Sequence, residues 1–107
     1  MSFDGHEDHR ISLAEGAEFT ARYRAQMSPG QIKGGFFGRD ALLTLLSQED
    51  CAGIRYYYGL DADGQQVLVL AGVDTRGNDQ IGEGFSCMEK SKPCPPDCGA
   101  ANILNGD

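Results

Sequence analysis

Near the middle of the chain stands the sequence Gly53-Ile54-Arg55-Tyr56-Tyr57-Tyr58-Gly59-Leu60. Its residues alternate between two faces in the way that is typical of a β-strand with one buried side. The turn sequence Asp61-Ala62-Asp63-Gly64 follows, and then the segment 66–73, which is apolar at consecutive positions. A strand that is apolar on both faces belongs in the centre of a sheet. The stretch therefore predicts a β-hairpin whose second strand is central. The residues of the first strand expected on the core face are Ile54, Tyr56, Tyr58 and Leu60.

Two helices are expected before this hairpin. Ser12 and Glu15 have the spacing of a capping box, in which each side chain bonds the backbone amide of the other residue. The first helix is expected to run from there to about Met27, because Ser28-Pro29-Gly30 follows. The second helix, at about residues 39–48, carries four leucines.

Together these elements predict a single α+β domain over residues 11–107, preceded by a flexible tail of residues 1–10. We expect both helices to pack on one face of a small antiparallel sheet, with a third strand beginning near Gln80 and Ile81. Residues 86–107 are expected to be irregular. The side chains expected to meet in the core are Phe19, Tyr23, Leu42, Leu45, Leu46, Val67, Val69 and Val73.

The composition narrows the classes of partner. The chain has 107 residues and a formal charge of −7, from sixteen acidic and nine basic residues. Such a charge repels nucleic acid and anionic membranes, so neither is expected as a partner. We expect a protein partner instead. The first ten residues are acidic and contain no apolar segment of the kind that directs export, which predicts a cytoplasmic location.

Three of the four cysteines lie close together near the C-terminus, at Cys87, Cys94 and Cys98. The segment Cys94-Pro95-Pro96-Asp97-Cys98 permits three interpretations: a local disulfide or free thiols, a metal site, or thiol–disulfide exchange. A zinc site needs about four ligands, and Cys51, His6 or His9 could supply the fourth. The Cys-x-x-x-Cys spacing is also found in copper-carrying sites, where thiolates select Cu(I).

The chain resembles a group of small uncharacterised bacterial proteins. The resemblance lies in Gly53-Ile54-Arg55-Tyr56-Tyr57-Tyr58-Gly59, Leu68-Val69-Leu70-Ala71-Gly72-Val73-Asp74 and Cys94-Pro95-Pro96-Asp97-Cys98-Gly99. It covers roughly residues 11–105, and implies a bacterial origin but no activity and no catalytic residue.

Two further groups of residues are candidate binding surfaces. Arg55 and Tyr57 lie on the strand face opposite Tyr56, and residues of these two types are favoured in binding hot spots. Phe36 and Phe37 stand in the glycine-rich connector between the helices, where they either anchor that connector or form an apolar patch. No catalytic triad is apparent in the sequence. We therefore expect a non-enzymatic binding or accessory protein, with metal binding and thiol–disulfide exchange as the alternatives.

Overall fold

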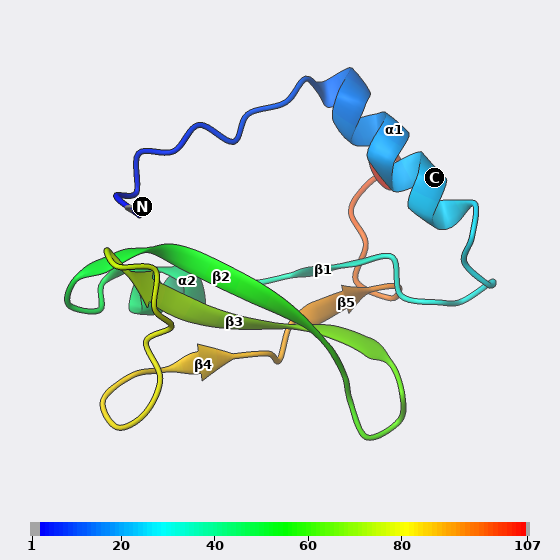
Figure 1. Ribbon diagram of the computed structural model, residues 1–107. Coiled ribbons are helices and arrows are strands. Elements are labelled where there is room, and N and C mark those ends of the chain that lie inside the picture. Colours follow the sequence, from blue (N-terminus) through cyan, green and yellow to red (C-terminus); the bar gives the residue numbers. More distant parts are fainter. Residues whose placement is uncertain (1–2, 107) are drawn as a thin grey trace. The chain divides into compact units, whose positions relative to one another are not determined.

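The computed structural model describes residues 3–106 (Figure 1). Its contacts divide the chain into two compact units. The first unit contains residues 3–7 and 37–91, and the second contains residues 8–36 and 92–106. Helices and antiparallel sheets are both present, so the α+β class is confirmed. The prediction of one domain over residues 11–107 stays a prediction.

The first unit is built on a three-stranded antiparallel sheet. Its strands are β2 (Cys51–Leu60), β3 (Gln66–Asp74) and β4 (Cys87–Met88), in the order β2-β3-β4. The predicted hairpin and the central position of its second strand are confirmed. Helix α2 (Arg39–Leu46) precedes β2 and contacts both β2 and β3.

Two turns of the first unit have the same hydrogen-bond pattern. Oδ1 of Asp61 accepts bonds from the amides of Asp63 and Gln65, and Gly64 has a φ of 81°. Asp74 likewise accepts bonds from the amides two and four residues later, and Gly77 has a φ of 86°. A positive φ is readily adopted by glycine, which explains the residue at the fourth position of each turn.

The prediction of a strand near Gln80 and Ile81 is wrong. Gln80 joins the sheet through one backbone bond to Gly72, beside an isolated bridge between Val73 and Asp79. The buried side chain of Gln80 makes two hydrogen bonds to the segment that follows α2. Its Oε1 accepts one from the side chain of Gln48, and its Nε2 donates one to the carbonyl of Glu49. The third strand forms later, at β4, where it pairs with residues 70 and 71 of β3.

The core of the first unit is small. It consists of Leu45 from α2 and Leu70, Ala71 and Val73 from β3. The predicted core positions of Leu45 and Val73 are confirmed, whereas Leu42, Val67 and Val69 are half-buried and Leu46 is exposed. The prediction for the β2 face is wrong beyond Ile54: Tyr56, Tyr58 and Leu60 are 56%, 73% and 74% exposed. Helix α2 lies at the Cys51 end of the hairpin, and the other end extends away from it (Figure 1).

The second unit combines a helix with a two-stranded sheet. Helix α1 (Leu13–Arg24) begins at the predicted capping box, with Oγ of Ser12 accepting a bond from the Glu15 amide. It ends three residues before Met27. Strands β1 (Gly34–Phe36) and β5 (Lys92–Cys94) pair antiparallel, which the sequence did not indicate. No helix among residues 3–106 has the length and apolar character needed to cross a membrane.

Of the two helices predicted to pack on one sheet, α2 contacts β2 and β3. The packing of α1 on that sheet stays a prediction. No residue of α1 is buried. Placing Phe19 and Tyr23 in the buried core is therefore wrong, because these side chains are 51% and 40% exposed.

Candidate functional site

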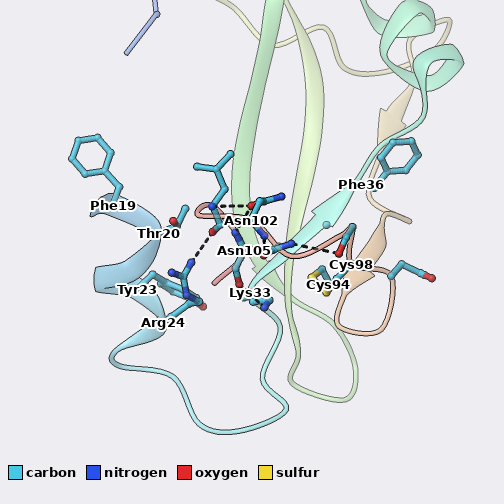
Figure 2. Close-up of a pocket in the computed structure, with 15 residues that line it drawn as sticks. Phe19, Thr20, Tyr23, Arg24, Lys33, Phe36, Cys94, Cys98, Asn102 and Asn105 are labelled. Carbon is cyan, nitrogen blue, oxygen red and sulfur yellow. Dashed lines mark hydrogen bonds between the residues drawn. A yellow bond between two sulfur atoms is a disulfide. The ribbon is translucent and has the colours of Figure 1, made fainter. Parts of the chain in front are cut away.

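The second unit contains a cavity of about 530 Å³ (Figure 2). Four segments of the chain line it: helix α1, strand β1, the cysteine-bearing turn and a C-terminal turn. In Figure 2 the α1 side chains stand on one side, with Phe36 and the two cysteines on the other. The lining residues include Phe19, Tyr23, Arg24, Lys33, Gly34, Gly35, Phe36, Cys94, Asp97, Cys98, Asn102 and Asn105.

Three aromatic residues, together with Leu104, supply the apolar part of the wall. Phe19 and Tyr23 are four residues apart on α1, so their side chains project from neighbouring positions on the same side of the helix. Phe36 ends strand β1 and is 58% exposed. Its neighbour Phe37 belongs to the first unit and is half-buried. The predicted aromatic pair is thus divided, and only Phe36 lines the cavity.

Two cationic side chains hold the C-terminal turn. Nη1 of Arg24 donates a hydrogen bond to the carbonyl of Leu104 at 2.6 Å, and Nζ of Lys33 donates one to the carbonyl of Asn105 at 2.6 Å. The turn is also braced internally, because Oδ1 of Asn102 accepts bonds from the amides of Leu104 and Asn105. Among residues 3–106, two positive charges and one negative charge, that of Asp97, therefore line the cavity of a strongly acidic chain.

Cys94 and Cys98 form a disulfide, with their Cα atoms 4.8 Å apart. The structure thus contains the local disulfide, one of the three alternatives for these cysteines. The carbonyl of Cys94 accepts a bond from the Lys33 amide at 2.8 Å, which ties the disulfide to the chain just before β1. Both cysteines are half-buried and line the cavity.

The other predicted metal ligands lie elsewhere. Cys51 and Cys87 are free thiols of the first unit, and Sγ of Cys51 donates a hydrogen bond to the carbonyl of Gly53. His6 and His9 are exposed. Between residues 3 and 106, no three or more His, Cys, Asp or Glu side chains are grouped so that they could hold a metal ion. The zinc and copper hypotheses stay predictions.

Arg55 and Tyr57 are joined to each other through Asp79, a residue that no sequence pattern indicated. Arg55 Nη1 donates to one carboxylate oxygen of Asp79 at 2.7 Å, and the Tyr57 hydroxyl donates to the other at 2.5 Å. Arg55 Nη1 also donates to the Gly77 carbonyl, and its guanidinium lies over the ring of Phe3, 5.7 Å from the centroid. These contacts hold the Asp74–Asn78 turn and the first described residues against β2.

The same contacts shift three pKa values. The hydrogen bond from Tyr57 and the charge of Arg55 lower the pKa of Asp79, although partial burial opposes the shift. The hydrogen bond to Asp79 raises the pKa of Tyr57 and that of Arg55. Arg55 and Tyr57 therefore belong to an internal network, and their role in a binding surface stays a prediction.

Comparison of the chain with protein-family models, with curated proteins and with solved structures found no match. The resemblance seen in the sequence stays a prediction.

Proposed function

We propose that this protein is a non-enzymatic binding protein that holds an extended segment of a partner protein in the second-unit cavity. The observation that carries the proposal is the combination of an aromatic wall with an open strand edge. The cavity volume of about 530 Å³ is that of a typical ligand site.

The open strand edge belongs to β1. Among the described residues, the backbone of β1 pairs only with β5, and only along one side. Gly34 and Gly35 present that backbone without side chains, and a Cβ atom on Gly34 would meet no atom within 4 Å. An extended segment can add to such an edge, because its main chain supplies hydrogen bonds and its side chains enter the adjacent pocket.

The lining residues favour a segment with a particular chemistry. Phe19, Tyr23 and Phe36 suit an aromatic or aliphatic side chain, while Arg24 and Lys33, against the one carboxylate of Asp97, give the described lining a net positive charge. An acidic residue near an apolar one would match this wall, since complementary charge across an interface favours association. We expect the partner to be cytoplasmic, because the sequence predicts that location for the chain.

The test is selection from a displayed library of short random peptides on the immobilised full chain. We expect the selected peptides to combine an apolar residue with Asp or Glu. Gly34→Val should weaken their binding about tenfold or more, a loss of about 1.4 kcal/mol or more, because it adds bulk at the strand edge, where a Cβ atom would meet no described atom within 4 Å.

A matched control is Phe85→Ala, which removes an exposed aromatic side chain from the first unit and should leave affinity unchanged. Phe36→Ala is a second cavity variant and should weaken binding as Gly34→Val does. Peptides that bind both cavity variants as well as the unmodified chain would show that the cavity is not the site.

Thiol–disulfide exchange is a second candidate, because the Cys94–Cys98 disulfide lines the same cavity. In this reaction a thiolate of a dithiol substrate attacks one sulfur, the bond between Cys94 and Cys98 breaks, and a mixed disulfide forms. The second substrate thiolate then attacks the substrate sulfur of that disulfide. The substrate leaves oxidised, and both cysteines end as thiols after taking up protons.

Equilibration with glutathione buffers tests this second candidate. An exchange protein should be half-reduced near the glutathione poise, roughly −180 to −320 mV depending on the compartment. A disulfide that stays fully oxidised across that interval would be a structural one, and the exchange function would then be wrong.

A further inference from the structure

Strand β2 forms an open edge of the first unit's sheet. It pairs with β3 along its whole length, from Cys51 opposite Asp74 to Leu60 opposite Gln66. On its other side, no backbone hydrogen bond joins residues 53–60 to any residue that the structure describes. A strand of this length with an unpaired row of amides and carbonyls is a template for another strand.

The usual protection of an edge strand is missing from β2. Its sequence contains no proline, lysine or acidic residue, and its one irregularity lies at the start, between Cys51 and Gly53. Tyr56 and Tyr58 stand edge to face on the exposed surface, with ring centroids 5.7 Å apart. The half of the strand near Leu60 is therefore both open and apolar.

The strand is also an almost neutral part of a strongly charged chain. The protein carries a formal charge of −7, whereas the only charged side chain in β2 is Arg55. Arg55 is ion-paired with Asp79 at 2.7 Å. Two copies of the chain repel each other over most of their surfaces, and this strand is a place where they can meet with little repulsion.

We infer that two copies of the chain pair through β2, antiparallel, with the two-fold axis at Tyr57. This register places Tyr56 opposite Tyr58 of the second copy, and Ile54 opposite Leu60. On the other face, Arg55 stands opposite Gly59, which has no side chain to displace Arg55 from Asp79. The two sheets become one continuous sheet of six strands.

The sequence of the strand favours this register over the one with the axis at Tyr58. Antiparallel pairing around a two-fold axis is isologous, so each favourable pair occurs twice. The Tyr57 axis gives an aromatic pair and an aliphatic pair on the exposed face, and such cross-strand pairs are what stabilise a sheet. With the axis at Tyr58, Ile54 would instead face Ala62 of the turn, and Tyr57 would face Gly59.

The test is the mass of the full chain in solution, measured by sedimentation equilibrium up to about 1 mM, where an association of about 4 kcal/mol is detected. We expect a reversible rise from 11.5 kDa to twice that mass. Tyr58→Lys should weaken association at least tenfold. The matched control Ile81→Lys changes a side chain that is 71% exposed and outside β2, and should leave association unchanged.

A double variant tests the register. In the variant that combines Tyr56→Lys with Tyr58→Glu, the lysine of each copy would face the glutamate of the other copy, which gives two opposite-charge pairs. This double variant should associate more strongly than Tyr56→Lys alone or Tyr58→Glu alone. Three outcomes would overturn the inference: a monomer at every concentration, equal loss of association in Ile81→Lys, or a dimer that survives non-reducing denaturing electrophoresis and is thus linked by disulfide. The double variant failing to exceed the single variants would overturn the register.

Discussion

Asp79 joins strand β2 to the segment that follows the Asp74–Asn78 turn through its carboxylate. Its carboxylate accepts hydrogen bonds from Arg55 and Tyr57 on β2, and its backbone forms an isolated bridge with Val73 of β3. Its partners come from a strand more than twenty residues earlier, so no spacing in the sequence marked it. A single acidic residue after a turn has no local pattern that distinguishes it from a solvated one.

The Asp79 network predicts a pH dependence of stability. The pKa of Asp79 is lowered in the folded protein, so its contribution is present above the unfolded value of about 3.9 and is lost as the pH falls through the folded value. The pKa of Tyr57 is raised, so its contribution is present below the unfolded value of about 10 and is lost as the pH rises through the folded value.

Urea unfolding of the unmodified chain and of Asp79→Asn between pH 3 and pH 11 measures this dependence. The destabilisation by Asp79→Asn should be greatest between about pH 4 and pH 10 and should shrink at both ends. Glu83→Gln, which changes an exposed carboxylate on a nearby turn, serves as the control. A destabilisation that is constant with pH would contradict the assigned network.

At the scale of elements, local chemistry determined what the sequence could predict. The capping box at Ser12, the glycine turns and the hairpin each depend on residues within a few positions of one another. Strands β1 and β5 were missed because they are three residues long, rich in glycine and proline, and pair Gly34 with Cys94 from the far end of the chain. The cavity was missed for the same reason, since four separate segments form its wall.

The two aspartate–glycine turns predict different costs for the same substitution. Gly64→Ala adds a methyl group where nothing lies within 4 Å, so it should cost only the strain of a positive φ, about 1–2 kcal/mol. Gly77→Ala has the same strain, and its added Cβ atom would also overlap the ring of Phe3. Its cost should therefore be larger.

Thermal unfolding of these variants, alone and in a Phe3→Ala background, separates the two terms. Removing the Phe3 ring should reduce the cost of Gly77→Ala to near that of Gly64→Ala. Equal costs in the original background would mean that Phe3 does not pack on this turn.

At the scale of the whole molecule, the division into two units predicts that a substitution in one unit lowers the stability of that unit and leaves the stability of the other unchanged. The Cys94–Cys98 disulfide closes a short loop in the second unit, and loop-closure entropy for so few residues corresponds to about 2 kcal/mol. Replacing both cysteines with serine should lower the protection of second-unit amides against hydrogen exchange by about that amount. Amides of Leu70 and Val73, in the core of the first unit, should keep their protection. Equal loss in both units would mean that they unfold together.

The proposed binding site is tested most directly by titrating a selected peptide into the isotopically labelled full chain and recording the amide resonances. We predict that the resonances which shift are those of residues 33–36 and 94–99, at the edge of β1 and at the disulfide turn, while those of residues 67–73 stay in place. Shifts confined to β2 and β3, or the same shifts in Gly34→Val, would contradict the assignment of the cavity as the binding site.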